Sequence, residues 1–319
     1  MGDWDKIKVL AIGGPTASGK TALSVKLAKR LNGEIICADS MQIYKGLDVG
    51  TAKVTQEEMQ GVPHHLVGFL EPSERFSVAD YVHKARDCIE AIAERGKLPI
   101  LVGGTGLYIQ SFLYGVKFSE QPGSDAVRQQ LQQQAEELGA EAMHQQLMKI
   151  DPLYASTVHP NNVGRVIRAL ELYQVAGITM TQQRERSLPS DSPYNSILLC
   201  PCYENRQTLY QRIDLRVLQM MEQGLLDEAR WVYENQPNCP TAAQAIGYKE
   251  FFPFFEGAQT QEECVAKLQQ ASRNYAKRQL TWFKRMPETQ WLYADEGGLY
   301  AQAMEQIGNK WPGYCKEGL

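Results

Sequence analysis

A phosphate-binding loop is the feature of this sequence with the most recognisable chemistry. Residues 14–21 read Gly-Pro-Thr-Ala-Ser-Gly-Lys-Thr, which fits the spacing G-x-x-x-x-G-K-[ST]. The glycines let the chain turn tightly, so that backbone N–H groups can converge on an anion. Lys20 would add a positive charge for a phosphate, and the hydroxyl of Thr21 could bind Mg²⁺. The sequence therefore predicts a pyrophosphate-binding P-loop formed by Gly14, Pro15, Thr16, Ala17, Ser18, Gly19, Lys20 and Thr21.

Asp39 is the acidic residue best placed to act beside this loop. In nucleoside triphosphatases of this type, an aspartate at the end of another apolar strand usually holds Mg²⁺. The apolar run 98–104 instead leads into Thr105 with no carboxylate, whereas Asp39 directly follows the run 34–38. Because ligands of an open parallel sheet bind outside the carboxyl ends of its strands, we expect Gly14, Asp39 and Thr105 to converge. These residues alone leave three roles open for Asp39: metal ligand, general base or helix N-cap.

Alternating apolar runs and amphipathic stretches must position these residues. Short apolar runs typical of strands buried on both faces of a parallel sheet occur at residues 7–12, 34–38, 98–104 and 196–202. Apolar residues at helical spacing predict helices over residues 21–31 and 77–95 and after Gly106. Strands that alternate with helices are the pattern of an α/β fold. We therefore predict a P-loop-containing core with a doubly wound parallel sheet.

A different composition separates the last of these strands from the others. Residues 119–150 are rich in Gln, Glu, Ala and Leu, which favours helix, and residues 163–176 carry apolar side chains at helical spacing. Residues 187–194 have the Ser and Pro content of a linker. We therefore expect an all-helical insertion domain at 118–190. The catalytic α/β core would consist of the two remaining parts, residues 1–117 and 191–319.

The cations of this acidic chain are concentrated near its C-terminal end. The net charge of −4 argues mildly against a nucleic-acid partner, because binding to phosphates needs clustered cations. Long helices are expected beyond residue 205, and the segment 273–285 within them holds basic and aromatic residues but no acidic one. Such a mixture can bind phosphates and stack on unpaired bases. We expect the aromatic side chains to lie mainly in the core, while Lys277, Arg278 and Gln279 face RNA.

Cysteine usage and hydropathy indicate the compartment. Seven cysteines without a CxxC pair are not typical of a disulfide framework or a zinc site, and they favour a reducing, cytoplasmic compartment. No apolar run reaches about 18 residues, so no membrane span is expected, and the charged N-terminus is not typical of a secretory signal. His64 and His65 follow Pro63 and are expected in a loop rather than in a metal site.

Taken together, the motifs resemble those of the tRNA dimethylallyltransferases of bacterial type, also called tRNA isopentenyltransferases. The matching blocks run in the order of that family over most of the chain: GPTASGKT at 14–21, DSMQIYKGLDVGTAK at 39–53, VGGTGLY at 102–108, HPNNVGRVIRALE at 159–171, IGYKE at 246–250 and YAKRQLTWF at 275–283. A P-loop alone also occurs in many nucleotide-binding and ATP-binding proteins, but the other blocks do not accompany it there. Only one cysteine, Cys315, follows Arg285, so the zinc finger of the eukaryotic members is not expected.

The resemblance implies a reaction. A dimethylallyl group would pass from dimethylallyl diphosphate to N6 of adenosine 37, beside the anticodon of certain tRNAs, with Mg²⁺ as cofactor. The P-loop would then hold a diphosphate leaving group, so the strand-end aspartate of the triphosphatases is not required. We expect a cytoplasmic, monomeric enzyme whose partners are tRNA and dimethylallyl diphosphate.

The family's catalytic residues can be carried over one by one. Asp39 matches the general base that accepts a proton from the adenine amino group, and Thr105 matches a residue beside the transferred group. The diphosphate and Mg²⁺ site is matched by Lys20, Thr21 and Arg216. The block that carries Arg216 is loose, so Arg212 stays open as the clamp on the diphosphate.

The tRNA-binding segments of the family also match parts of this sequence. The matching residues are Asp39, Ser40, Met41, Gln42, Thr105, Arg128, Gly164, Arg165, Val166, Ile167, Arg168, Ile246, Gly247, Tyr248, Lys249, Lys277, Arg278, Gln279 and Trp282. The target adenine must leave its stack to reach an enclosed donor. The helical insertion would bind the anticodon stem.

Three other functions are compatible with a P-loop of this kind. A small-molecule kinase would form ADP with a small acceptor and would leave the basic segment 273–285 without a role. An RNA-binding protein that uses ATP as a conformational switch would leave the RNA chemically unchanged. An adenylate isopentenyltransferase would act on free AMP, but DSMQ at 39–42, the insertion and the basic segment favour tRNA.

Overall fold

Two compact units make up the chain in a computed structural model, which describes residues 6–118, 124–187, 192–296 and 298–314. We name residues Met1–Leu113 with Pro193–Leu319 the core unit, and Tyr114–Ser192 the helical unit. The sequence pattern puts the ends of the insertion at residues 118 and 190, and residues 188–191 of the predicted linker lie outside the described part of the chain. Within the described residues, no helix has both the length and the hydropathy needed to cross a membrane.

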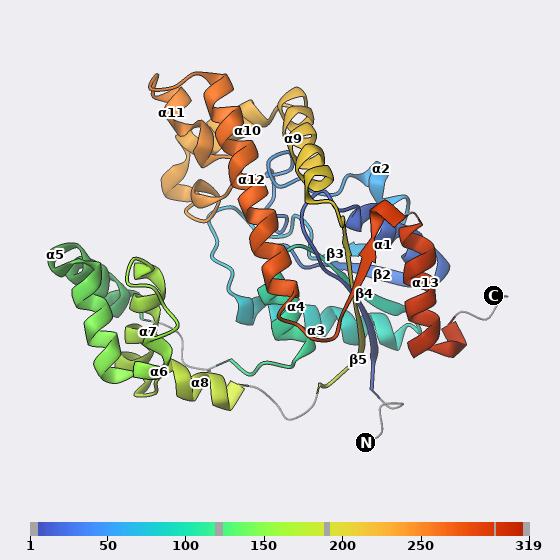
Figure 1. Cartoon of the computed structure of the whole chain (residues 1–319), viewed down its shortest axis with the longest axis horizontal. Coiled ribbons are helices and arrows are strands. Elements are labelled where there is room, and N and C mark those ends of the chain that lie inside the picture. Colours follow the sequence, from blue (N-terminus) through green and yellow to red (C-terminus); the bar gives the residue numbers. More distant parts are fainter. Residues whose placement is uncertain (1–5, 119–123, 188–191, 297, 315–319) are drawn as a thin grey trace. The chain divides into compact units, whose positions relative to one another are not determined.

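A six-stranded parallel sheet forms the centre of the core unit (Figure 1). Its strands lie in the order β3-β2-β4-β1-β5-β6, and all neighbours run parallel. The strands are β1 (Lys8–Ile12), β2 (Gly33–Cys37), β3 (His64–His65), β4 (Leu98–Val102), β5 (Asn195–Cys202) and β6 (Thr289–Tyr293). The inner strands bury nearly every side chain, as the uninterrupted apolar runs predict.

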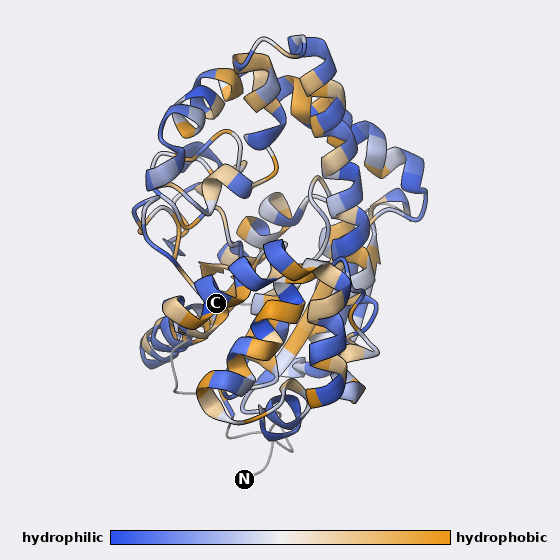
Figure 2. Ribbon diagram, turned by 90° about the vertical axis from the view of Figure 1, so that its left-hand side faces the viewer, coloured by the Kyte–Doolittle hydropathy of each residue, from blue (hydrophilic) through white to orange (hydrophobic). Residues whose placement is uncertain are grey.

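Helices cover both faces of this sheet, which confirms the predicted doubly wound α/β fold. α1 and α13 pack on one face, where Leu23 and Ile307 join the same apolar cluster as Ile100 and Ile197. α3 and α4 lie over β2 and β4 on the other face. Apolar residues are concentrated on the strands and on the inward sides of these helices (Figure 2). The helices of the core unit are α1 (Lys20–Arg30), α2 (Gln56–Met59), α3 (Val78–Glu94), α4 (Gly106–Leu113), α9 (Arg206–Glu222), α10 (Leu225–Glu234), α11 (Phe252–Phe255), α12 (Gln261–Phe283) and α13 (Leu299–Lys310).

The two edge strands do not follow from the sequence pattern. β3 consists only of His64 and His65, which pair with Ile35 and Ile36 of β2, so the prediction of a loop at the two histidines is wrong. β6 lies among the long C-terminal helices, and Leu292 is its one buried residue. An edge strand with so few buried residues produces no recognisable apolar run.

A second apolar cluster joins the segment after β2 to the C-terminal helices. Ile43, Tyr44 and Leu47 of this segment are buried, and the same cluster contains Leu225 of α10 and Leu268 of α12. The chain that follows Asp39 is therefore anchored to helices that come much later in the sequence. Short 3₁₀ turns lie in or near this layer and at the C-terminal end, at Gln236–Asn238, Ala242–Gln244, Lys249–Phe251, Ala294–Glu296 and Pro312–Tyr314.

The helical unit has a core of its own. Its helices are α5 (Asp125–Ile150), α6 (Pro152–Ala155), α7 (Val163–Ala176) and α8 (Met180–Ser187). Leu131 of α5 packs in one cluster with Val166 and Leu170 of α7. α5 is interrupted at Gly139, where φ is 82° and ψ is 163°. The helix predicted over 163–176 is confirmed as α7, and every element among the described residues of this unit is a helix.

A buried carboxylate joins β2 to its neighbours at the end of the sheet opposite the P-loop. The side chain of Glu34 is 5% exposed and lies 2.7 Å from Nε2 of His65. It accepts hydrogen bonds from Arg95 (2.7 Å) and Lys97 (2.8 Å). Burial alone would raise the pKa of Glu34, but the hydrogen bonds with Lys97, His65 and Arg95 lower it to about 2. The fold therefore stabilises the ionised form of Glu34.

Replacing Glu34 with Gln should lower the free energy of unfolding by about 2 kcal/mol near neutral pH, because the folded state stabilises the carboxylate. Since the pKa is lower in the folded chain than in the unfolded one, this stabilisation is complete above about pH 5 and is lost as the pH falls toward 2. Denaturant unfolding at neutral and at acidic pH measures the difference. Glu71→Gln, which removes the exposed partner of Lys45, is the control and should have a much smaller effect. An equal loss of stability at both pH values would contradict the ionic role of Glu34.

Candidate active site

The P-loop connects β1 to α1 at the carboxyl edge of the sheet. Its backbone enters the left-handed region at Gly14 (φ 134°), Ala17 (φ 60°) and Gly19 (φ 89°), which folds the loop tightly. α1 begins at Lys20, and no side chain among the described residues caps its N-terminus. The first backbone N–H groups of α1 are therefore available to an anion, together with the partial positive charge of the helix end.

Lys20 is folded back onto the loop that carries it. Its ammonium donates hydrogen bonds to the carbonyl oxygens of Gly14 (3.0 Å) and Pro15 (2.5 Å). Burial lowers the pKa of Lys20 to about 8, and the charge of Arg216 acts in the same direction, whereas Cys200 and Asp39 oppose it. Lys20 is therefore protonated near neutral pH and lies in the electrostatic field of both a cation and a carboxylate.

Both candidate arginines of α9 reach the P-loop. Arg216 donates a hydrogen bond to the hydroxyl of Thr16 (3.1 Å), and the exposed Arg212 donates one to the carbonyl of Ala17 (3.3 Å). Burial lowers the pKa of Arg216, while the charges of Glu58 and Asp39 raise it. Arg216 thus shares its environment with Lys20 and Asp39, and Arg212 lies on the outer side of the loop.

Asp39 and Thr105 meet where β2 and β4 end. The Oδ1 atom of Asp39 accepts hydrogen bonds from the backbone N–H groups of Met41 (2.9 Å) and Gln42 (3.4 Å). Within the described residues Oδ2 has no hydrogen-bond partner, so this oxygen is available to accept a proton. The hydroxyl of Thr105 accepts a hydrogen bond from the N–H group of Ser40 (3.0 Å), which fixes it beside Asp39. The P-loop, Asp39 and Thr105 therefore lie at one edge of the sheet, as the topology predicts.

Tyr275 of α12 belongs to the same site, although the sequence pattern assigns it to the core. Burial raises its pKa above the usual value and Asp39 does the same, while hydrogen bonds with the side chains of Thr105 and Gln279 lower it. Tyr275 precedes Gln279 by one turn of α12, so both side chains lie on one face of this helix. Their spacing is the sequence signal that could have placed Tyr275 in the site.

Gln279 holds two loops of the site together. Its side-chain oxygen accepts a hydrogen bond from the N–H group of Thr16 (2.9 Å), and its amide nitrogen donates one to the carbonyl of Gly104 (3.0 Å). The side chain is buried, so the prediction that Gln279 faces RNA is wrong. Its amide instead joins the P-loop to the loop after β4.

Three glycines allow α12 to lie this close. A Cβ atom at Gly104 would come within 2.2 Å of the amide nitrogen of Gln279, and one at Gly106 within 2.4 Å of the ring of Trp282. A Cβ atom at Gly13 would come within 2.3 Å of the ring of Phe283. Any larger residue at these positions would push α12 away from the strand ends. Gly104 and Gly106 of the VGGTG block thus serve the packing of α12 against the strand ends.

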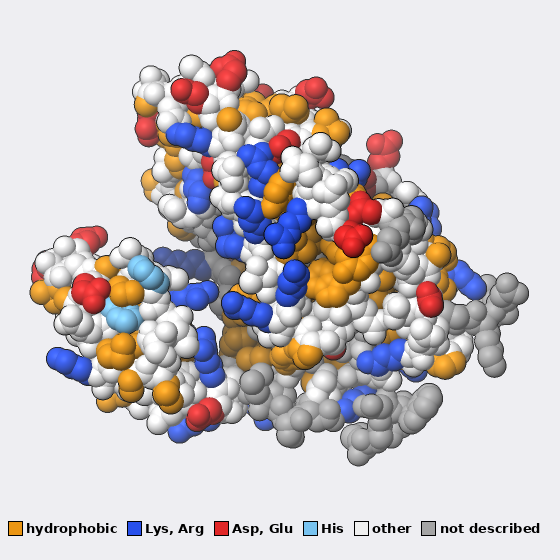
Figure 3. Space-filling model, viewed as in Figure 1, with side chains coloured by type: hydrophobic (Ala, Val, Ile, Leu, Met, Phe, Trp, Pro, Cys, Tyr) orange, Lys and Arg blue, Asp and Glu red, His pale blue; other side chains and the backbone are white. Residues whose placement is uncertain are grey.

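The opposite face of α12 is basic and exposed. The side chains of Lys277 and Arg278 are exposed. Lys277 lies over the ring of Tyr210, and Arg278 lies over the ring of Tyr275. Lys and Arg side chains gather on this face over α9 and α12 (Figure 3). These cations are thus available to phosphate groups in solution.

Several residues matched to tRNA-binding segments are packing residues. Tyr248 is fully buried, and its hydroxyl donates a hydrogen bond to Glu228 (2.7 Å). Val166 and Ile167 are buried in the core of the helical unit. The side chains of these three residues are therefore not part of an exposed RNA-binding surface. Their hydrophobic character is the signal that separates them from the exposed Arg165 and Lys249 beside them.

Two arginines of the helical unit share one buried carboxylate. Arg128 of α5 donates hydrogen bonds to both carboxylate oxygens of Glu171 (3.1 Å each), and Arg168 of α7 donates one (2.9 Å). Glu171 is 1% exposed, whereas both arginines reach solvent. The guanidinium groups are held in fixed positions with part of their N–H groups directed outward.

The described residues offer few ligands for a metal ion. No group of three or more His, Cys, Asp and Glu side chains among them could hold one. Mg²⁺ is usually bound by one or two side chains together with substrate phosphates, rather than by a complete protein cage. The exposed Thr21, next to Lys20, fits such a substrate-bound Mg²⁺.

Comparison with known proteins identifies the family. A family model described as IPP transferase matches residues 42–286, and one described as isopentenyl transferase matches residues 7–67. The chain is 49% identical to the tRNA dimethylallyltransferase of Anoxybacillus flavithermus, over 94% of either chain. It is also 49% identical to the tRNA dimethylallyltransferase of Bacillus subtilis, over 90% of this chain and 91% of that protein.

Solved structures agree with these sequence matches. The tRNA isopentenylpyrophosphate transferase of Bacillus halodurans is 44% identical, with a TM-score of 0.69, over 96% of this chain and 98% of that one. A eukaryotic dimethylallyltransferase acting on tRNA is 30% identical, with a TM-score of 0.81, over 98% of this chain and 81% of that one. The chain therefore belongs to the tRNA dimethylallyltransferase family and is an enzyme of the prenyltransferase class.

Proposed function

We propose that this enzyme transfers the dimethylallyl group of dimethylallyl diphosphate to N6 of adenosine 37 in tRNA and releases diphosphate. The observation that carries this proposal is that Lys20 and Arg216 both donate hydrogen bonds to the P-loop, while Asp39 lies at the same edge of the sheet. Positive charge at the P-loop would stabilise the diphosphate leaving group, and a carboxylate beside it would accept the proton of the nucleophile. The relatives are named for action on tRNA, which supports the same acceptor.

The P-loop side of the site stabilises the leaving group. As the bond between the allylic carbon and the diphosphate oxygen breaks, negative charge builds on the diphosphate. Lys20 and Arg216 would balance this charge, and the N–H groups at the start of α1 would donate hydrogen bonds to it. Thr21 would hold Mg²⁺, which supplies further positive charge to the phosphate oxygens when bound.

Asp39 acts on the acceptor. The amino group of adenine is a poor nucleophile, because its lone pair is delocalised into the ring. A carboxylate that hydrogen-bonds the amino group and takes its proton, as nitrogen bonds to the allylic carbon, lowers the barrier. Oδ2 of Asp39 is the oxygen that would take this proton, since Oδ1 already accepts the N–H groups of Met41 and Gln42. Thr105 would keep the carboxylate and its segment in place through Ser40.

Exposed cations would hold the RNA. An adenine beside the anticodon must leave its stack before its amino group can reach an enclosed donor. Lys277 and Arg278 on α12 and Arg165 in the helical unit are exposed and suit contacts to backbone phosphates. Arg128 and Arg168, which Glu171 holds, present ordered guanidinium groups for the same purpose.

The direct test is incubation of the purified protein with labelled dimethylallyl diphosphate, Mg²⁺ and unmodified tRNA that has adenosines at positions 36–38. Mass spectrometry of the nucleosides should find one added C5 unit on adenine. Free AMP in place of tRNA should give no product. Hydrolysis of ATP with the RNA left unmodified would contradict the proposal.

Replacing Asp39 with Asn should lower kcat by about 100-fold or more, because proton transfer by a positioned base contributes on this order. The dissociation constant of dimethylallyl diphosphate should change by less than about threefold, since its binding energy comes from the P-loop. Single-turnover transfer and calorimetric donor binding measure the two effects separately. Similar losses of transfer and of donor binding would indicate that Asp39 is a metal ligand instead.

The affinity for dimethylallyl diphosphate should fall as the pH rises through 8. Lys20 is protonated below about pH 8 and neutral above it, and the bound diphosphate favours the protonated form. At fixed Mg²⁺, the dissociation constant of dimethylallyl diphosphate should rise by about tenfold between neutral pH and a pH one to two units above the pKa of Lys20. Lys20→Arg keeps its charge over this range, so its affinity should not depend on pH. A flat profile for the wild type would contradict the role of Lys20.

Replacing Lys277 and Arg278 together with Ala should weaken tRNA binding and reduce its dependence on salt. Each lost phosphate contact lowers the slope of log K against log salt by about 0.7–0.9. Filter binding over a salt series measures the slope. Lys26→Ala with Lys29→Ala removes two exposed cations from α1 and serves as the control, with an unchanged slope expected. If the slope of the α12 variant also stays unchanged, these two residues do not contact the RNA.

A further inference from the structure

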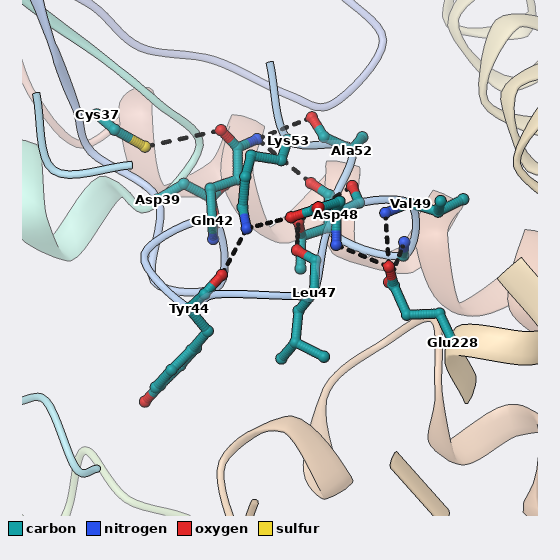
Figure 4. Close-up of polar contacts among 12 residues, drawn as sticks. Cys37, Asp39, Gln42, Tyr44, Leu47, Asp48, Val49, Ala52, Lys53 and Glu228 are labelled. Carbon is teal, nitrogen blue, oxygen red and sulfur yellow. Dashed lines mark hydrogen bonds and ion pairs between the residues drawn. The ribbon is translucent and has the colours of Figure 1, made fainter. Parts of the chain in front are cut away.

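The segment from Asp39 to Lys53 folds as a closed unit that begins with the proposed base. Gln42 donates hydrogen bonds from its amide nitrogen to the carbonyl oxygens of Thr51 (3.3 Å) and Ala52 (3.1 Å), and its amide oxygen lies 3.7 Å from the thiol of Cys37. Gln42 therefore joins the two ends of the segment (Figure 4).

The side chain of Lys53 makes further contacts within the same segment. Its ammonium donates hydrogen bonds to the carbonyl of Tyr44 and to the carboxylate of Asp48. The apolar side chains of Tyr44 and Leu47 are buried beneath it. The segment has no regular helix or strand of its own, so these side-chain contacts define its shape.

Glu228 of α10 binds the backbone of residues 48–50 in this segment. One carboxylate oxygen accepts the N–H groups of Asp48 (2.7 Å) and Val49 (2.9 Å), and the other accepts the N–H group of Gly50 (2.7 Å). The hydroxyl of Tyr248 donates a fourth hydrogen bond to this second oxygen (2.7 Å). The carboxylate faces the backbone of these residues directly (Figure 4). Four donors occupy the acceptor sites of an ionised carboxylate, so no neutral side chain could replace it without loss.

Close backbone packing fixes Glu228 against the segment. A Cβ atom at Gly50 would come within 2.4 Å of the ring of Tyr248, and one at Gly247 within 3.1 Å of the carbonyl of Gly50. Gly247 has a φ of 112°, and its N–H group donates a hydrogen bond to Glu250 (2.9 Å). The IGYKE block therefore packs directly against the segment, and this contact buries Tyr248.

We infer that Glu228 is a positioning residue for the transfer reaction, which acts by holding the segment that carries Asp39. This inference rests on the proposed function of Asp39 as the base. A continuous set of contacts joins the two carboxylates: Glu228 holds residues 48–50, Gln42 holds the adjoining residues 51 and 52, and the N–H groups of Met41 and Gln42 hold Asp39. The hydrogen bonds of Glu228 within the described part of the chain go to residues 48–50 and to Tyr248, and none goes to the P-loop.

A general base must be held within a fraction of an ångström of its productive position. Asp39 depends on the backbone of Met41 and Gln42 for its orientation, and Gln42 depends in turn on the carbonyl groups that follow the Glu228 contacts. The P-loop, where the donor would bind, is instead held by Gln279 and by Arg216 of α9. Loss of Glu228 should therefore affect the acceptor step and not donor binding.

The test is Glu228→Gln in the full-length protein, with Asp227→Asn as the matched control. Asp227 is the exposed neighbour on α10, so its variant removes the same charge without touching the segment. Glu228→Gln should lower kcat by about tenfold or more and leave KM for dimethylallyl diphosphate within about twofold of wild type. Tyr248→Phe removes only one of the four donors and should lower kcat by about threefold. This milder variant provides the comparison should Glu228→Gln fold poorly.

A double-mutant cycle with Asp39→Asn separates positioning from general stability. If Glu228 acts through Asp39, adding Glu228→Gln to Asp39→Asn should lower kcat by less than about threefold further. The same fold-loss in both backgrounds, or a full kcat in Glu228→Gln, would overturn the inference. Wild-type protein that fails to modify tRNA would instead contradict the proposed function, so the two failures are distinguishable.

Discussion

The amide of Gln279 accepts the N–H group of Thr16 and donates to the carbonyl of Gly104, and these two hydrogen bonds fix the distance between the P-loop and the loop after β4. Both contacts span a large part of the sequence and both depend on glycines that leave room for α12. The P-loop carries Lys20 and contacts Arg216 of α9, and the loop after β4 carries Thr105, which holds the segment of Asp39 through Ser40. The buried side chain of Gln279 thus sets the distance between the P-loop and the loop that carries Thr105.

The site separates positive and negative charge within a small volume. Lys20 and Arg216 lie on the P-loop side, and Asp39 lies at the end of β2. Among the described residues Asp39 forms no ion pair with either cation, and its Oδ1 atom accepts backbone N–H groups instead. An ion pair would neutralise both groups and leave neither of them for substrate. The N–H groups of Met41 and Gln42 thus orient the carboxylate of Asp39, while Lys20 and Arg216 have neutral oxygen acceptors of the P-loop as their partners.

The sequence predicts those features that local pattern controls. The P-loop, the inner strands and α7 follow from glycine spacing, apolar runs and helical periodicity. β3 and β6 do not, because edge strands bury too little to leave a pattern. The roles of Gln279 and Glu228 also do not follow, since each is defined by partners more than 170 positions away in the chain. The family resemblance places Tyr248 in an RNA-contacting segment because the IGYKE block matches one, whereas its hydroxyl and ring contact Glu228 and the segment after β2.

The contacts of Lys20 with its own loop have a consequence for selectivity. The ammonium donates hydrogen bonds to two carbonyl oxygens of the P-loop, so a ligand of this ammonium competes with neutral acceptors that are well placed. Phosphate oxygens can do so because their formal charge makes them stronger partners for an ammonium. An uncharged group offers no such charge, so these contacts favour phosphorylated ligands over uncharged ones at this loop.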